Sequence, residues 1–156
     1  MQHKIRIMAF AGALMTAGVL LAGGFALGIG KPSANPEAQA KSAVLVVVGY
    51  ACHDADKTSV TATAEGIVNG KRETIPLKLI VLSGQSTYAV TRQWPAEGKW
   101  VITLVEANSK FNGQPSAILR VDGDTVDFAG VTRLTRAPEK TEIEAALNTT
   151  AVASKF

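Results

Sequence analysis

Apolar and polar residues alternate along most of the chain after residue 42, the pattern of β-strands that bury one face. Turn-forming residues interrupt the alternation every 8 to 14 residues. Ala43 to Tyr50 differs, because it is apolar throughout, as expected of a strand covered on both faces. The predicted strands are 43–50, 59–68, 73–82, 87–94, 99–107, 117–123 and 125–134, with a break expected in the last at Gly130.

The alternation also predicts which side chains point inward. In the strands concerned these are Val60, Ala62 and Ala64; Ile75, Leu77, Leu79 and Val81; Tyr88 and Val90; and Trp100, Ile102 and Leu104. Asn69-Gly70 joins two of the strands and is a strong hairpin signal, because both residues tolerate a positive φ. Pro76 cannot donate a ladder hydrogen bond, so its strand is expected at a sheet edge or at a bulge.

Seven short strands with frequent turns predict an all-β protein, an immunoglobulin-like antiparallel β-sandwich that spans residues 41–136. Residues 137–156 follow as a short helix and a flexible tail. The helix is expected from Pro138 to Leu147, where Glu139 and Glu142 suit its first turns.

The N-terminal 40 residues have a different pattern. Ile7 to Gly30 is a run of 24 residues without a charge, preceded by Lys4 and Arg6 and followed by Lys31. An apolar helix of about 20 residues crosses a bilayer. A basic start, an apolar stretch and a small-x-small triplet, here Ala38-Gln39-Ala40, are the parts of an export signal.

Two interpretations of residues 1–40 remain open: a signal peptide cleaved after Ala40, or a signal anchor with a short polar linker. In both, the basic residues before the run favour a cytoplasmic N-terminus and place the rest of the chain outside. The expected location is therefore the periplasm or the outer side of the cytoplasmic membrane, with membrane contact only through the N-terminal segment.

The charge balance argues against nucleic acid as a partner. Without residues 1–40 the net charge falls from +3 to +1, because three basic residues and one acidic residue leave. No cluster of lysine and arginine with interleaved aromatic residues remains, so the electrostatic basis for nucleic-acid binding is missing.

The stretch from Thr87 to Leu104 resembles small exported bacterial immunoglobulin-like domains of the YtkA-like and FixH-like kind. The matching residues are Tyr88, Val90, Pro95, Gly98, Trp100, Ile102 and Leu104. Those proteins also carry one N-terminal apolar segment before a single sandwich. The resemblance implies a membrane-anchored accessory protein for a copper-containing oxidase, but it carries over no metal ligand.

Cys52 and His53 are the candidate metal ligands. Cys52 is the only cysteine, and Asp54 and Asp56 follow in a turn-like sequence. A thiolate with an imidazole suits copper(I) or zinc. However, residues 41–156 contain no second Cys or His and no Met, so a closed site would need almost all its ligands from this one stretch. The preferred interpretation is that Cys52 is buried as a small apolar residue, with intermolecular disulfide pairing as an alternative.

No catalytic pattern is recognisable. His53 adjoins Cys52 and has little freedom to act as its base, and nucleophile-elbow and phosphate-loop motifs are absent from the sequence. Trp94, expected to be half exposed, and Arg92, expected near the rim of the sheet, are candidate interface residues. The sequence thus predicts an exported, non-enzymatic binding or accessory module of the cell envelope, without a cofactor. The alternatives are a copper- or zinc-related accessory protein that uses Cys52 and His53, and a structural envelope protein.

Overall fold

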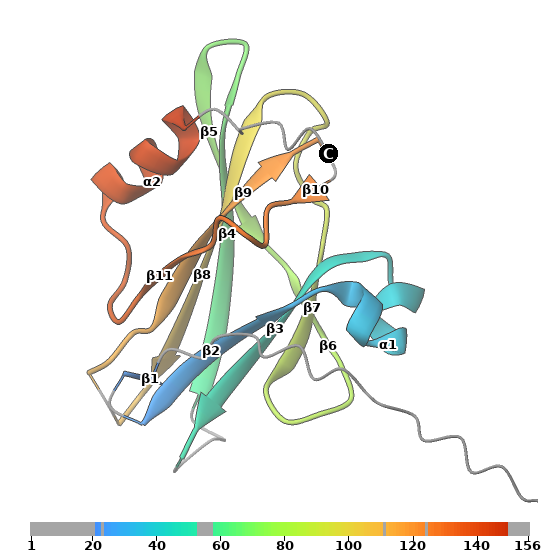
Figure 1. The fold of residues 1–156 in the computed structure, drawn as a ribbon, viewed down its shortest axis with the longest axis vertical. Helices are drawn as coiled ribbons and strands as arrows, with labels where there is room; N and C mark the ends of the chain where they lie inside the picture. The colour runs from blue at the N-terminus through green and yellow to red at the C-terminus, as the bar shows by residue number, and fades with distance from the viewer. Residues whose placement is uncertain (1–20, 23, 53–57, 111, 124, 150–156) are drawn as a thin grey trace, which may run out of the picture.

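Two antiparallel sheets pack face to face in the computed structural model, which describes residues 21–22, 24–52, 58–110, 112–123 and 125–149 (Figure 1). The first sheet has the strand order β1-β2-β3-β7-β6, and the second has the order β10-β9-β8-β4-β5 with β11 also paired to β9. The strands of the first sheet are β1 (Leu21–Ala22), β2 (Phe25–Gly30), β3 (Ala43–Ala51), β6 (Leu79–Val81) and β7 (Thr87–Thr91). Those of the second are β4 (Thr58–Val68), β5 (Lys71–Leu77), β8 (Lys99–Asn108), β9 (Ser116–Asp122), β10 (Thr125–Val126) and β11 (Thr132–Leu134).

The main core lies between the sheets and confirms most of the predicted inward faces. Trp100, Ile102 and Leu104 of β8 are buried there together with Leu45 and Val47 of β3. Because side chains alternate along a strand, the same face of β8 continues to Glu106 and Asn108, which are also buried. Alternation therefore brings a carboxyl group into the space between the sheets.

Asn69 and Gly70 form the predicted hairpin between β4 and β5. Both have positive φ, 49° and 76°, and Val68 pairs with Lys71 across the turn. Pro76 lies in β5, at the edge of its sheet, as expected of a residue without an N–H. The expected break at Gly130 is also present, since β10 and β11 are separate strands on either side of it.

The predicted strand 73–82 is wrong in one respect. It divides at Lys78 into β5 of the second sheet and β6 of the first, so the chain crosses from sheet to sheet. The backbone N–H and carbonyl of Lys78 are bonded to the side chain of Gln93. Leu79 still packs against the main core, but Val81, at the end of this edge strand, is 70% exposed instead of inward.

The end of the apolar N-terminal run is a strand and not a helix. Residues 25–30 form β2, which pairs with β3 over six consecutive residues from Phe25↔Ala51 to Gly30↔Val46. The sheet thus includes residues that the sequence assigned to a leader, and it begins well before residue 41. Residues 1–20 lie outside the described part of the chain. Within the described part, no helix has the length and apolarity needed to cross a bilayer.

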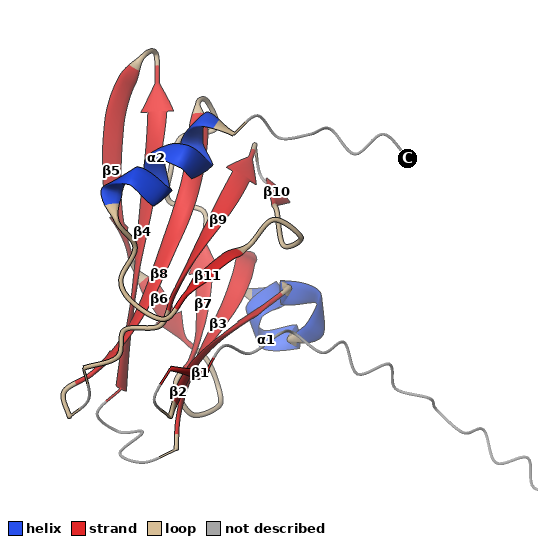
Figure 2. Ribbon diagram, turned by 60° about the vertical axis from the view of Figure 1, so that its left-hand side comes forward, coloured by secondary structure: helices blue, strands red, loops and turns tan. Residues whose placement is uncertain are grey.

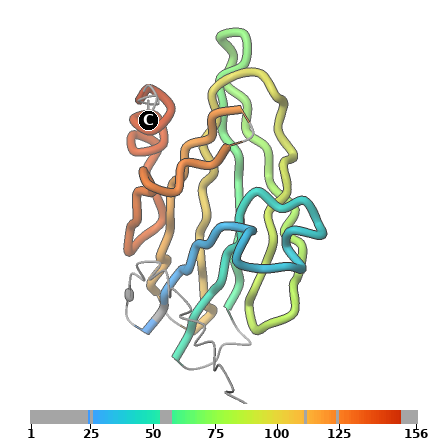
Figure 3. Tube along the Cα trace, turned by 45° about the vertical axis from the view of Figure 1, so that its right-hand side comes forward, coloured from blue at the N-terminus to red at the C-terminus, as the bar shows by residue number. Residues whose placement is uncertain are grey.

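Two short helices lie on the outer faces of the sheets (Figures 2 and 3). α1 (Pro36–Ala40), preceded by the 3₁₀ turn Pro32–Ala34, covers the first sheet, where Ala38 is completely buried. The Ala38-Gln39-Ala40 triplet is therefore part of the folded protein. α2 (Lys140–Asn148) lies across the second sheet, close to the predicted 138–147, and buries Ile143 and Leu147 against Val101 and Ile118.

Candidate functional site

The predicted metal ligands lie where β3 ends. Cys52 is the first residue after β3 and is exposed, contrary to the expected burial. It lies at the very end of the sheet, where its backbone N–H donates to the carbonyl of Gly24. His53, Asp54 and Asp56 fall outside the described residues. Among the residues that are described, no three histidine, cysteine, aspartate or glutamate side chains form a group that could hold a metal ion.

The candidate interface residues Arg92 and Trp94 are in contact with each other. Arg92 is partly exposed and donates from Nε to the carbonyl of Trp94 at 3.2 Å. The Trp94 side chain is only 4% exposed and belongs to the main core, so the expected half exposure is wrong. Trp94 lies in the loop after β7, beyond Arg92 and Gln93, and its side chain turns back between the sheets, a path that strand alternation does not predict. It is a core residue and offers no surface to a partner.

Concave surface borders helix α2 on more than one side. A helix that lies on a sheet leaves a groove along each side, because a cylinder touches the sheet along one line only. Three grooves adjoin α2, with volumes of about 230, 580 and 270 Å³. The largest lies between α2 and the β4–β5 hairpin, and its polar rim includes Glu65, Arg72, Lys140 and Glu144.

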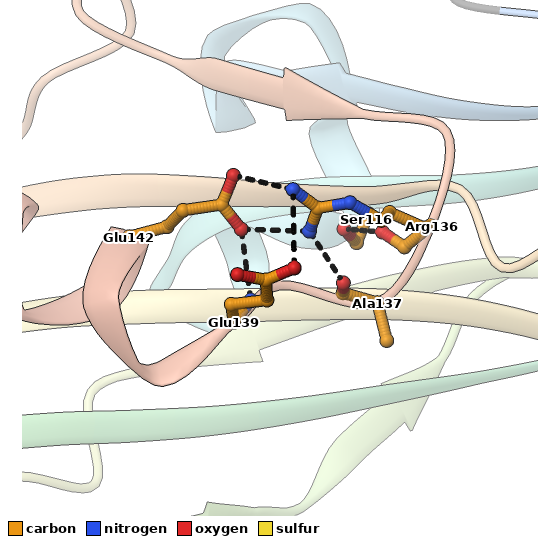
Figure 4. Close-up of polar contacts among 5 residues, drawn as sticks. All are labelled: Ser116, Arg136, Ala137, Glu139 and Glu142. Carbon is orange, nitrogen blue, oxygen red and sulfur yellow. Dashed lines mark hydrogen bonds and ion pairs between the residues drawn. The ribbon is translucent and has the colours of Figure 1, made fainter.

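The N-terminus of α2 is fixed by Arg136 (Figure 4). Its guanidinium donates to both carboxylate oxygens of Glu142, at 2.8 and 2.9 Å, and to the carbonyl of Ala137 at 3.0 Å. The same Glu142 carboxylate accepts from the backbone N–H of Glu139, which caps the first turn. The hydrogen bond from Arg136 holds the pKa of Glu142 below its usual value. The hydroxyl of Ser116 on β9 donates to the carbonyl of Arg136 and joins this network to the sheet.

Two further arginine pairs line the grooves. Arg72 on β5 donates to Glu65 on β4 at 2.6 Å and to Glu144 on α2 at 2.5 Å, so it ties the helix to the hairpin. On the other side of α2, Arg120 pairs with Asp127, and this hydrogen bond lowers the pKa of Asp127. The grooves therefore present charges of both signs on a preformed surface. These pairs could not be predicted from the sequence, because residues such as Arg72 and Glu144 are 72 positions apart.

Glu106 is a second unusual feature, and it is not among the residues predicted from the sequence. It is fully buried on the inner face of β8, and neither carboxylate oxygen has a hydrogen-bond partner among the described residues. Gly49 on the opposite sheet leaves room for it, since a Cβ built there would lie 3.2 Å from its Oε1 and against Thr58 and Val60. The signal was available: extending the Trp100, Ile102, Leu104 alternation by one step leads to Glu106.

Burial raises the pKa of Glu106 to about 7. The folded protein therefore holds a proton at pH values where an unfolded chain, with the ordinary value of 4.5, is already ionised. The free energy of unfolding therefore has its full contribution from the proton on Glu106 below about pH 4.5. This contribution falls as the pH rises to about 7. The loss amounts to about 3 kcal/mol.

Glu106→Gln should remove this pH dependence, because a buried amide does not ionise. Urea unfolding at pH 5 and pH 8 measures it: the parent is expected to be less stable at pH 8, and Glu106→Gln to have nearly the same free energy of unfolding at both. The exposed Glu97→Gln is the matched control and should behave as the parent does. A parent protein whose stability rose between pH 5 and pH 8 would contradict the buried, unpaired state of Glu106.

Comparison with known proteins adds no relative. No protein-family model matches the sequence, and no curated protein or solved structure shows significant similarity to it.

Proposed function

We propose that this chain is an exported, non-enzymatic binding or accessory module of the cell envelope, which holds an envelope protein or ligand on the α2 face of its second sheet. The observation that carries this is the set of three grooves along α2, the largest of about 580 Å³. Of the three, only the largest falls within the volume of about 300–1,000 Å³ that is typical of ligand sites.

The strand order supports an immunoglobulin-like fold. In that fold one sheet has the strand order A-B-E-D, which β2-β3-β7-β6 matches. The other sheet has the order G-F-C with an added C′ strand, which β9-β8-β4-β5 matches. Such domains support many functions through their surfaces, so the order argues for architecture and not for activity.

A binding role fits the chemistry of the grooves better than catalysis does. Arg72 and Arg120 are engaged with carboxylates, and among the described groove-lining residues there is no histidine or cysteine. Nucleophilic catalysis needs a nucleophile with an adjacent base. Paired charges on a rigid helix and sheet instead suit recognition of a polar partner surface.

A second candidate function is favoured by one observation. Cys52 is exposed, so its thiol is accessible to a soft metal, and His53 follows it directly. A copper- or zinc-related accessory protein would use these two residues as ligands. A purely structural envelope protein is the third candidate.

Purification of the protein from its native envelope distinguishes the three. We expect a stoichiometric partner whose recovery is lost with Lys140→Glu in the largest groove and kept with Lys78→Glu, which lines none of the three grooves. Both lysines are exposed, and an acidic residue in the first turn of α2 interacts favourably with the helix dipole, which offsets its repulsion from Glu144.

Other outcomes would contradict the binding proposal. Equal recovery of the partner with both variants would exclude the α2 face. One equivalent of copper or zinc, lost with Cys52→Ser and with His53→Ala, would establish the second candidate. A protein that carries neither partner nor metal would leave the structural role.

A further inference from the structure

The first sheet needs the residues that the sequence assigned to a leader. β2 runs along β3 for six residue pairs, and Leu27 and Ile29 are 2% and 6% exposed within the main core. Ala38 is completely buried on the outer face of the same sheet. Nearby, the Glu37 carboxylate accepts from the backbone N–H of Ser83 at 2.7 Å.

Cleavage after Ala40 would therefore cut into the folded domain. It would remove a paired strand together with α1, and it would expose the flank of β3 that β2 occupies. An unpaired, apolar strand edge promotes aggregation, and stable proteins avoid it. An export signal in this chain has to end before β2.

The sequence immediately upstream of β2 provides such an end. Ala22 and Gly24 have the small side chains that a signal peptidase requires at its −3 and −1 positions, and Phe25 is the first residue of β2. Before the two-residue strand β1 lie 14 uncharged residues, Ile7 to Leu20, preceded by Lys4 and Arg6. The apolar core of a cleaved signal has about 7–15 residues.

The same length argues against a retained anchor. If residues from Leu21 onward stay in the sheet, only 14 uncharged residues remain before it, and at 1.5 Å per residue even a fully helical segment of that length measures only about 21 Å. The hydrocarbon core of a bilayer is about 30 Å thick. Once the residues of the sheet are excluded, the apolar run is too short to span a membrane but has the length of a cleavable signal.

We propose that a membrane signal peptidase cleaves this chain between Gly24 and Phe25, so that the mature protein begins at the first residue of β2. Water adds across this peptide bond, which leaves a carboxylate on Gly24 and an amino group on Phe25. This inference rests on the proposed export of the protein and places its processing site.

Cleavage at this bond removes little from the fold. β1 contributes only two residue pairs at the edge of the sheet, Leu21↔Ala26 and Ala22↔Phe25. The backbone N–H of Cys52 loses the carbonyl of Gly24, but this residue is exposed and water can replace that acceptor. All six pairs between β2 and β3 remain.

The test is expression of the full chain in a bacterium, followed by cell fractionation and by N-terminal sequencing and intact mass measurement of the product. The expected product is an envelope protein that begins at Phe25. Gly24→Gln should abolish this product and leave uncleaved precursor. Ala40→Gln is the control and should not alter the product, because it changes an exposed residue at the −1 position of the downstream triplet.

The other possible outcomes distinguish a wrong cleavage site from a failure of export. An envelope protein that begins at Lys41, or one whose cleavage is blocked by Ala40→Gln instead of Gly24→Gln, would overturn the Gly24–Phe25 site and leave export intact. Full-length protein in the membrane would likewise overturn cleavage but not export. Full-length protein in the cytosol would overturn both.

Discussion

A fragment of residues 41–156 is expected to be only marginally stable and partly unfolded at 25 °C, whereas a fragment of residues 25–156 is expected to fold. The shorter fragment lacks β2, which contributes Leu27 and Ile29 to the core, and α1 with its buried Ala38. Burial of two such aliphatic side chains contributes roughly 3–6 kcal/mol. Because a whole domain is stable by only about 5–15 kcal/mol, the loss brings the shorter fragment close to the unfolding midpoint.

Far-ultraviolet circular dichroism with urea titration measures the difference between the two fragments. Leu27→Ala in the full chain tests the same contact without truncation and should cost about 2–5 kcal/mol. Equal urea midpoints for the two fragments would show that β2 adds nothing to the fold, and the Gly24–Phe25 proposal would lose its structural basis.

Trp100→Ala is expected to lower the free energy of unfolding by about 3–5 kcal/mol. The Trp100 side chain is 3% exposed in the main core, and its Nε1 donates to the carbonyl of Glu97 at 2.8 Å. Its ring lies directly on Gly66 of the neighbouring strand, where a Cβ would approach it to 2.4 Å. The alanine variant therefore leaves a cavity beside Gly66, which has no side chain to fill it.

Val81→Ala is the control for Trp100→Ala, because Val81 is 70% exposed and its truncation should change stability by less than about 0.5 kcal/mol. Thermal or urea unfolding of both variants gives the comparison. If the two variants had equal stability, Trp100 could not occupy the core, and the register of β8 against β4 would have to be different.

The parts of the fold that the sequence predicted are those that local chemistry decides. Asn69 and Gly70 specify their hairpin through positive φ, and the alternation around Trp100 specifies the inner face of β8. Pro76 indicated an edge strand because it lacks an N–H. In each case the signal lies within a few residues of the feature, so no knowledge of distant contacts is needed.

The parts that could not be predicted depend on distant partners. An uncharged run such as residues 25–30 is compatible with a helix or with a buried strand, and only pairing with β3 decides between them. Trp94 is buried because its loop turns back into the core. The grooves at α2 form only when a helix from the end of the chain meets a hairpin near its middle, joined by Arg72 and Glu144.

Hydrogen exchange of the natively purified protein, followed by mass spectrometry, tests the central claim most directly. The claim is that residues 25–30 are a strand of the first sheet in the mature protein. The prediction is that a peptide covering these residues is present and that its amides exchange slowly, at rates similar to those of β3. Absence of this peptide from the mature protein, or exchange at the rate of an unstructured chain, would contradict the account.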